Sequence, residues 1–550
     1  MKSDRLRKSK KAMKKSVRYL SMTALALMGA VITGCSSDEN SIEEPKQPEN
    51  DKVVTLTATV SMDGSATTRA LTEDGVKTFA EGDRIAVIYT DKGGNTRMAA
   101  SSSLQTSDIT NNGKSASFTV SLSEPDKTKD VTYVYPAAMA NADGTINYDA
   151  LASQDGTLST IASSLDYCTN SGVWNNGALP TLTLENRLAI CAYTIKNSDG
   201  TSDMTGSVTD MTISDGTNIY TVSRSAAAGY IYVAIRPTSG ANISYTATAG
   251  ANVYEKSVTA KTYEAGNIYP LGLKMTKVDG LLIGKFTINK GGDQVRFSQG
   301  NLQAKTTDKG ANWTWGFATN QWDYIGDAAA NTKINGNGTV SENGTVDLFG
   351  WVGASSSWTG DAQYGISNST TDSEYGTSSS DALKSDWGNT ISSGWRTLTI
   401  AEWDYLFNTR ASGSTVNGTS NARYAYATIN TDGTSSVEGM ILFPDGVTIA
   451  DSEATWGTIN GAGTNCTSAQ WTALEGKGCV FLPAACYRMG ATVYGVASGD
   501  YGNAFYYWSS SPYTANVEKA YNVYFGQSLS PQSYNFRSYG FSVRLVRDVK

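Results

Sequence analysis

The fold class is decided by a run near the N-terminus that alternates apolar and small polar residues, Val53-Val54-Thr55-Leu56-Thr57-Ala58-Thr59-Val60. Alternation with a period of two, rich in β-branched residues, is typical of a half-buried β-strand. Similar runs recur at residues 84–89, 116–122 and 230–235, and each is bounded by Gly, Asn, Asp or Ser. The sequence therefore predicts a mainly β chain, with a sandwich or two stacked sandwiches over residues 52–276.

The composition excludes several classes of enzyme. Of the 550 residues, 40% are hydrophobic, which is enough for packed cores, and none is histidine. Without histidine the chain cannot form a Ser-His-Asp triad, a Cys-His pair or an HExxH zinc site. We therefore expect a protein that is not an enzyme and that needs no cofactor. A calcium ion is left open, although no DxDxDG loop indicates it.

The charge of the chain is divided unevenly. Residues 1–34 carry a net charge of +8 and the whole chain carries −7, which leaves −15 for the remainder. An acidic body disfavours nucleic acid as a partner, because phosphate binding requires a positive surface. We therefore interpret the basic block as part of a targeting signal.

The N-terminal segment has the pattern of such a signal. An apolar run at residues 19–32 is shorter than the roughly 20 residues of a membrane-spanning helix. Its end, Val31-Ile32-Thr33-Gly34-Cys35, resembles a bacterial lipobox. The resemblance implies a lipoprotein signal peptide at residues 1–34 and lipidation of Cys35. The alternative is an ordinary signal peptide that happens to contain a cysteine.

The residues that follow Cys35 are polar and acidic, and we expect a flexible tether over residues 35–51. An acidic stretch at this place resembles the surface-export signal of Bacteroidetes lipoproteins. The resemblance implies a lipid anchor in the cell outer membrane and exposure at the cell surface. We expect the five further cysteines, which have no CxxC spacing, to be buried and reduced: Cys168, Cys191, Cys466, Cys479 and Cys486. The alternative is disulfide bonding, which is possible outside the cytoplasm.

Several motifs stand out between residues 52 and 276. They are Thr67-Thr68-Arg69-Ala70, Phe79-Ala80-Glu81-Gly82-Asp83-Arg84-Ile85, Tyr133-Val134-Tyr135-Pro136, a strand expected at residues 182–190, and Tyr263-Glu264-Ala265-Gly266-Asn267-Ile268-Tyr269. Together they resemble the fimbrillin family, the lipoprotein pilins of Bacteroidales. The resemblance implies a fimbrillin-like region of two transthyretin-like sandwiches. The alternative is a generic β-sandwich lipoprotein.

The same family implies a role for Arg69. Fimbrillins are cut after an arginine by a trypsin-like protease, which removes the first strand, and a neighbouring subunit then fills the groove with its own strand. Here the cut would fall between Arg69 and Ala70, after a loop expected at residues 63–68. The implied partners are other pilin subunits, bound by donor-strand complementation. The alternative is a solvated loop arginine.

The composition changes after residue 276. Eleven of the 12 tryptophans lie in residues 277–550. One helix is expected at residues 399–408, where Thr399 and Glu402 have the spacing of a capping box. A second is expected at residues 468–475, with Ser468 as its cap.

A set of motifs in this segment resembles the C-type-lectin-like domains of Bacteroidetes surface proteins. The set covers about residues 285–547 and includes Val295-Arg296-Phe297-Ser298-Gln299-Gly300-Asn301, Asp347-Leu348-Phe349-Gly350-Trp351, Tyr507-Trp508-Ser509-Ser510 and Gly540-Phe541-Ser542-Val543-Arg544-Leu545. The resemblance implies an α+β ligand-binding domain at residues 277–550. The ending is also similar to the formylglycine-generating branch of that fold, but Cys479 and Cys486 do not match its reactive cysteine pair.

The densest tyrosines of the chain lie in residues 501–540, which hold 8 of the 30, interleaved with Asn and Ser. This is the composition of binding paratopes, and it also suits sugars, because rings stack on sugar faces and amides bond to hydroxyls. The candidate ligand-binding residues are Tyr506, Tyr513, Asn516, Asn522, Tyr524, Gln527, Ser528, Ser533, Tyr534, Asn535, Phe536 and Ser538.

Alternation within this region predicts which side chains face outward. Val523 and Phe525 are expected in the core, together with Tyr521, which points Asn522 and Tyr524 to solvent. The binding edge is then expected in a loop at residues 527–538. In the resembled family this C-terminal region is varied by diversity-generating retroelements, which favour Asn, Tyr and Ser codons.

Together these observations favour a cell-surface adhesin. The leading hypothesis is a fimbrial tip subunit that binds a carbohydrate or protein ligand on a host or bacterial surface through its C-terminal domain. The tip position is expected because a globular domain at the C-terminal end would prevent onward strand donation. The second hypothesis is an outer-membrane glycan-binding lipoprotein outside any pilus, and the third is an enzyme that uses carboxylates such as Glu438 and Asp445.

Overall fold

The computed structural model describes residues 53–62, 78–323, 328–485, 487–494, 504–526 and 528–549. This part of the chain is mainly β, as predicted. None of its helices is long and apolar enough to cross a membrane. The predicted lipidation residue Cys35, the predicted cleavage residues Arg69 and Ala70, and Gln527 lie outside the described residues.

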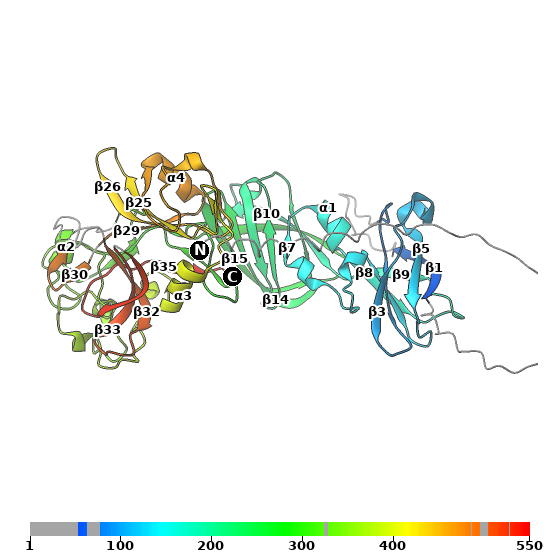
Figure 1. The fold of residues 1–550 in the computed structure, drawn as a ribbon, viewed down its shortest axis with the longest axis horizontal. Coiled ribbons are helices and arrows are strands. Elements are labelled where there is room, and N and C mark those ends of the chain that lie inside the picture. The colour runs from blue at the N-terminus through cyan, green and yellow to red at the C-terminus, as the bar shows by residue number, and fades with distance from the viewer. Residues whose placement is uncertain are drawn as a thin grey trace, which may run out of the picture. The chain divides into compact units, whose positions relative to one another are not determined.

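The first sheet has eight strands in the order β3-β2-β6-β8-β9-β1-β5-β4, and β8, β9, β1 and β5 lie side by side in Figure 1. The strands are β1 (Val53–Met62), β2 (Ala86–Thr90), β3 (Thr96–Ala100), β4 (Ile109–Thr110), β5 (Ser115–Ser123), β6 (Val131–Tyr135), β8 (Cys168–Gly172) and β9 (Leu182–Asn186). The runs predicted at residues 53–60, 84–89 and 116–122 are confirmed as β1, β2 and β5.

Strand β1 shows why the sequence folds this way. Its even-numbered side chains are all apolar and face the core, where Val60 is fully buried and packs with Phe118, Val120 and Tyr133. Its odd-numbered threonines face outward, and their hydroxyls pair with β5, as between Thr55 and Ser121 at 3.0 Å. The predicted alternation of apolar and polar residues therefore corresponds to side chains that face the core and the solvent in turn.

The second sheet has the order β13-β10-β16-β15-β14-β11-β12-β7. Its strands are β7 (Ser153–Gln154), β10 (Ala189–Asn197), β11 (Val208–Ser214), β12 (Ile219–Ser223), β13 (Ile231–Ile235), β14 (Thr238–Ala249), β15 (Asn252–Tyr263) and β16 (Ile268–Lys277), and the short helix α1 covers Leu158–Thr160. The run predicted at residues 230–235 is β13.

The single strand predicted at residues 182–190 is wrong. Residues 182–186 form β9, which pairs in parallel with β1 in the first sheet, with Leu182 opposite Val60. Strand β10 begins at Ala189 and pairs with β13 and β16 in the second sheet. The chain passes from one sheet to the other at residues 187–188, directly after the polar residues Glu185 and Asn186.

Beyond β16 the described strands are short and form six small sheets. They are β17 (Phe286–Thr287), β18 (Gln294–Phe297), β19 (Leu302–Thr306), β20 (Thr314–Phe317), β21 (Gly344–Val346), β22 (Trp395–Thr397), β23 (Thr415–Val416), β24 (Thr419–Ser420), β25 (Tyr424–Asn430), β26 (Ser436–Leu442), β27 (Thr448–Ile449), β28 (Thr464–Thr467), β29 (Val480–Pro483), β30 (Tyr487–Met489), β31 (Thr492–Tyr494), β32 (Phe505–Pro512), β33 (Lys519–Phe525), β34 (Leu529–Phe536) and β35 (Leu545–Asp548).

The α-helices described in this segment are α2 (Ala328–Thr332), α3 (Ile400–Asp404) and α4 (Ser468–Gly476). The capping box of α3 is confirmed, since Thr399 Oγ1 accepts from the Glu402 N–H at 3.3 Å and Glu402 Oε2 accepts from the Thr399 N–H at 2.7 Å. The second helix is also present, but its cap is Thr467 rather than Ser468, because the Thr467 hydroxyl accepts from the Gln470 N–H.

The tryptophans of this segment build its cores. Trp351, Trp387 and Trp508 lie in one buried cluster, and Trp403 and Trp471 lie in two others. Four cysteines are buried, as predicted, and form no disulfide among the described residues: Cys168, Cys191, Cys466 and Cys479. Burial raises the pKa of the Cys466 thiol to about 11, so it behaves as an apolar side chain. Cys486 lies outside the described residues.

Candidate ligand-binding surface

The predicted binding edge is a sheet rather than a loop. The loop expected at residues 527–538 is wrong, because residues 529–536 pair with β33 as strand β34. This pairing sets Tyr521 opposite Tyr534 and Lys519 opposite Phe536. The sequence hides the strand because it contains Pro531, which is tolerated where β34 forms the edge of its sheet.

Aromatic side chains gather on one face of β33 and β34. The rings of Tyr513 and Tyr534 stack with centroids 3.9 Å apart, and Tyr521 meets Tyr513 edge-on at 5.2 Å. The Lys519 ammonium lies over two rings, 5.1 Å from the centroid of Tyr534 and 4.8 Å from that of Phe536. We call these five residues the tyrosine surface.

The side chains of the tyrosine surface are partly exposed and are preorganised by their contacts with one another. Tyr534 is 43% exposed, which is unusual for so large a side chain. The hydrogen bond between Tyr534 and Tyr513 raises the pKa of Tyr513, so the Tyr513 phenol stays protonated near neutral pH and can bond to a ligand. Stacked rings held by a lysine lose little freedom on binding and present both an apolar face and polar rims. Such a surface can bind a sugar or a protein patch.

Two of the predicted tyrosines lie in a different ring cluster. Tyr506 and Tyr524 are paired across β32 and β33 with ring centroids 5.0 Å apart. Tyr506 also stacks on the buried Phe541 at 4.6 Å. Alternation along β33 places this pair on the face opposite the tyrosine surface, so the candidate residues do not form one continuous patch.

The prediction that Asn522 faces outward is wrong. Asn522 is fully buried opposite Trp508, and its Oδ1 accepts from Asn535 Nδ2 at 3.3 Å. Both faces of β33 are covered at this point, because Ala520 belongs to one core cluster and Val523 to another. The predicted core positions of Val523 and Phe525 are confirmed, whereas Tyr521 is half-buried and belongs to the tyrosine surface.

The other predicted residues are scattered. Ser538 is buried, and its N–H donates to Asp372 at 3.0 Å, so it is fixed in the frame rather than displayed. Asn516 is half-buried and its Oδ1 accepts from the Glu518 N–H, which shapes the turn before β33. Ser528 is exposed and Ser533 is half-buried. Of the predicted set, the structure therefore brings together Tyr513, Tyr534 and Phe536.

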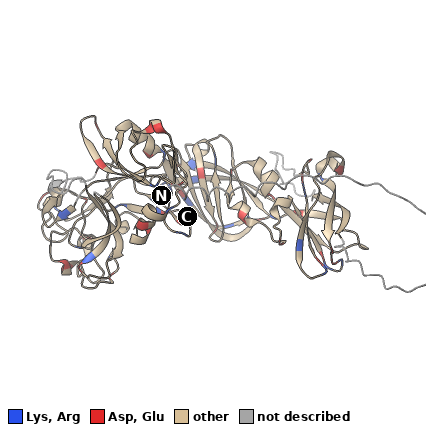
Figure 2. Ribbon diagram, viewed as in Figure 1, with Lys and Arg blue, Asp and Glu red and all other residues tan. Residues whose placement is uncertain are grey.

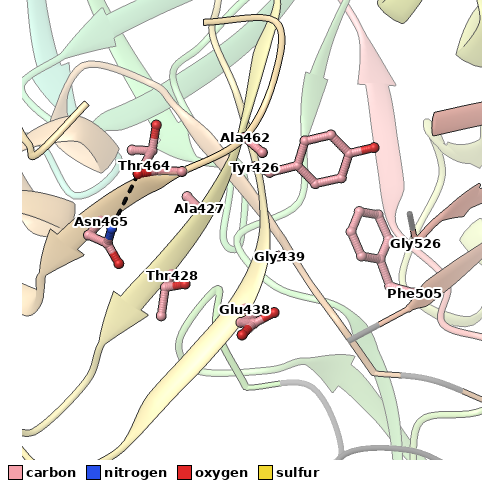
Figure 3. Close-up of a pocket in the computed structure, with 11 residues that line it drawn as sticks. Tyr426, Ala427, Thr428, Glu438, Gly439, Ala462, Thr464, Asn465, Phe505 and Gly526 are labelled. Carbon is pink, nitrogen blue, oxygen red and sulfur yellow. Dashed lines mark hydrogen bonds between the residues drawn. The ribbon is translucent and has the colours of Figure 1, made fainter. Parts of the chain in front are cut away.

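Sequence reasoning missed a hollow beside this sheet. It has a volume of about 390 Å³ and lies between strands β25 and β26, the turn before β28, Phe505 and Gly526 (Figure 3). Its side chains include Tyr426, Thr428 and Glu438. The alternation Tyr424-Ala425-Tyr426-Ala427-Thr428-Ile429-Asn430 could have marked one lining strand, but no local signal connects it to residue 505.

The charged residues of the described chain are dispersed. Lysine, arginine and acidic residues occur singly along many strands and turns in Figure 2. Among these residues no group of three or more Cys, Asp or Glu could hold a metal ion. Asp445, considered above as a catalytic carboxylate, is engaged on both oxygens by Arg410, Thr287 and Gln294. Its contacts are those of a structural residue.

Comparison with known proteins gives distant similarities. No protein-family model and no curated protein matches the chain. Similar solved structures include a fimbrial assembly protein from Parabacteroides distasonis, 13% identical with a TM-score of 0.25, covering 45% of this chain and 96% of that one. A candidate cell adhesion protein from Bacteroides uniformis is 18% identical with a TM-score of 0.25, covering 41% of this chain and 97% of its own. The minor pilin of Streptococcus agalactiae is 9% identical with a TM-score of 0.17, covering 40% and 96%.

Proposed function

We propose that the chain is a cell-surface adhesin that assembles into a pilus by exchange of its first strand. The observation that carries the proposal is the position of β1. This strand is the first described element of the chain, yet it lies inside the first sheet between β5 and β9. It pairs with β5 over nine residues, from Val53 opposite Ser123 to Ser61 opposite Ser115.

Removing β1 would open a groove that another strand can fill. The groove would expose the edges of β5 and β9 and the apolar side chains beneath β1, including Phe118 and Leu184. Unpaired edges and an uncovered core favour pairing with a strand of matching alternation. A cut after Arg69, beyond the C-terminal end of β1 at Met62, would free the strand while leaving the rest of the sheet in one chain.

The proposal extends to the place of the chain in the pilus. The lipobox-like segment with Cys35 would anchor the precursor in the outer membrane before the cut. Strands β17 to β35 follow the second sheet and end at Asp548, so the C-terminal side of that sheet continues into a large folded segment. A subunit with such a segment could accept a neighbour's strand but not donate one, which favours the tip.

Assembly is tested by changing the cleavage residue. We expect Arg69→Ala to keep the chain in the outer-membrane fraction and out of purified fimbriae, because β1 would remain covalently attached. Arg69→Lys keeps the charge and identifies the protease: it should behave like Arg69→Ala if the protease is arginine-specific, and like the wild type if the protease also cuts after lysine. Antibody to residues 277–550 should label wild-type fimbriae once, at the free end.

The alternative is a glycan-binding lipoprotein that stays outside any pilus. It predicts that an arginine-specific protease leaves the chain intact and that Arg69→Ala changes neither the size nor the fraction of the protein. Label along the shaft would contradict the tip position alone. Label confined to the cell envelope, with an uncut wild-type chain, would contradict the pilus proposal as a whole.

Ligand binding by the tyrosine surface is tested at Tyr534. We expect Tyr534→Ala to reduce the affinity for the bound glycan or cell type by about tenfold, since an exposed, preorganised tyrosine is a typical hot spot. Binding is measured on a glycan array and, for protein ligands, by flow cytometry on a panel of bacterial and epithelial cells. Tyr230→Ala is the matched control, because Tyr230 is 45% exposed but lies before β13. Equal losses in both variants would contradict a role for this surface.

A further inference from the structure

The hollow between β25, β26 and Phe505 is a candidate for a second binding site. Its volume of about 390 Å³ lies within the range of pockets that hold small organic molecules. It is separate from the tyrosine surface, since none of the five residues of that surface lines it. Ligand binding in this hollow therefore does not depend on the tyrosine surface or on pilus assembly.

Three polar side chains form a row across neighbouring strands of this hollow. Thr428 on β25 is directly opposite Glu438 on β26, and on its other side it is opposite Asn465 on β28. Residues opposite one another share a face of the sheet, and strands lie about 4.8 Å apart, so the row spans roughly 10 Å. Figure 3 shows Thr428 and Glu438 next to each other on adjoining strands.

The polar groups of this row are available to a ligand. Among the described residues, the side chains of Thr428 and Glu438 have no hydrogen-bond partner, and Glu438 is exposed. Asn465 Nδ2 donates to the Gly463 carbonyl at 3.2 Å, which orients the amide and leaves its Oδ1 as an acceptor. The row thus offers a carboxylate, a hydroxyl and an amide oxygen held by three strands of one sheet.

The other wall of the hollow is aromatic. Tyr426 points toward Phe505 and Gly526 in Figure 3, and Phe505 is buried in a stack on Phe525 with centroids 4.0 Å apart. The Tyr426 hydroxyl is buried and has no hydrogen-bond partner among the described residues. Burial raises the pKa of Tyr426 to about 12, so the hydroxyl keeps its proton. An unpaired buried hydroxyl is costly unless something binds it.

Glycines contribute to the lining of the hollow. A Cβ on Gly439 would come within 2.4 Å of the Leu482 carbonyl oxygen, so β26 can approach β29 closely only without a side chain. Gly526 and Gly463 also line the space.

We infer that this hollow binds a neutral saccharide unit, with its ring against Tyr426 and its hydroxyls on Thr428, Glu438 and Asn465. Sugar hydroxyls both donate and accept hydrogen bonds. They can therefore donate to the acceptors of Glu438 and Asn465 and pair with the hydroxyls of Thr428 and Tyr426. A wholly apolar ligand would leave the Glu438 carboxylate desolvated and unpaired. No lysine or arginine is among the described residues that line the hollow, so an acidic sugar would meet only the repulsion of Glu438.

The test uses the full chain and five probes: glucose, galactose, mannose, N-acetylglucosamine and glucuronate. Binding is followed by saturation-transfer NMR and titration. We expect millimolar binding of at least one neutral sugar, with glucuronate at least about tenfold weaker. Glu438→Ala and Thr428→Val should each weaken the neutral sugar about tenfold, as expected for the loss of one hydrogen bond to a ligand.

Glu438→Gln tests the role of the carboxylate charge more directly than Glu438→Ala does. It keeps the hydrogen-bonding shape and removes the charge, so it should abolish the discrimination against glucuronate while retaining the neutral sugar. Ser436→Ala is the matched control, because Ser436 lies two residues away on the same face of β26 and is exposed outside the hollow. Tyr534→Ala should also leave this binding unchanged, which separates it from the tyrosine surface.

Two results would overturn the inference. One is the absence of saturation transfer from the wild-type protein to all four neutral sugars. The other is equal affinity of the wild type, Glu438→Ala and Thr428→Val for the sugar that binds. Thermal unfolding of each variant shows whether the fold is intact, and Glu438 and Thr428 are placed at the margin of the core, so we expect unchanged midpoints.

Discussion

Replacing Val60 by aspartate is expected to lower the free energy of unfolding of the first sheet by about 4 kcal/mol or more. Val60 is fully buried in the middle of the first core. It lies opposite Ala116 on β5 and Leu182 on β9, so a carboxylate there would be enclosed on both sides by paired strands. An unpaired buried charge of this kind is among the few single changes with so large a cost. Urea unfolding followed by tyrosine fluorescence and circular dichroism measures it.

Thr57→Asp is the control for this change. Thr57 lies on the same strand but faces outward and is exposed, so we expect a change within about 0.5 kcal/mol. The same pair of substitutions tests strand exchange in trans. A peptide of residues 53–62 should occupy the groove of the cut protein; the Thr57→Asp peptide should compete with it and the Val60→Asp peptide should not. Equal competition by the Thr57→Asp and Val60→Asp peptides would show that the core-facing side chains of β1 do not hold this strand in the groove.

The strands and helix caps could be predicted because their signals are local. The alternation at residues 53–60 gave β1 its core face, and the pair Thr399 and Glu402 marked the start of α3. The passage at residues 187–188 was not predicted, because the polar residues Glu185 and Asn186 interrupt the pattern there without showing which partner each flanking strand pairs with. Which sheet a strand joins depends on distant partners, and the sequence does not display them.

The binding surface was predictable in composition but not in arrangement. Tyr513, Tyr534 and Phe536 stood out as aromatic residues among Ser and Asn, and the structure places them together. Asn522 has the same sequence context, yet it is buried because a second core covers the expected outer face of β33. The hollow beside Glu438 needs three strands in register, which no single segment encodes.

The carboxylate of Asp445 connects strands β17 and β18 to Arg410 through hydrogen bonds. Asp445 Oδ1 accepts from Arg410 Nη1 at 2.8 Å, and its Oδ2 accepts from the Thr287 N–H at 2.6 Å and from Gln294 Nε2 at 3.0 Å. Arg410 is 1% exposed and also donates to the Phe443 carbonyl at 3.0 Å. Burial lowers the pKa of Arg410, and the adjacent Asp445 opposes that effect. The carboxylate therefore offsets part of the cost of burying the guanidinium charge.

Asp445→Ala is therefore expected to destabilise the C-terminal segment by about 3–5 kcal/mol, because it leaves the Arg410 charge buried without its partner. It also removes the acceptor of the Thr287 N–H and of Gln294, so β17 and β18 should loosen first. Urea unfolding followed by tryptophan fluorescence reports the loss, since Trp403 lies in the core that contains Phe286 and Val295.

A double-mutant cycle with Arg410→Met separates the pair from its surroundings. Removing both charges should cost much less than the sum of the two single changes, because no unpaired charge remains. Asp451→Ala is the control, since Asp451 is an exposed aspartate in a nearby short turn and should change stability by less than about 0.5 kcal/mol. A loss below about 1 kcal/mol for Asp445→Ala, or strict additivity in the cycle, would mean that Arg410 is solvated and that the carboxylate is free for another role.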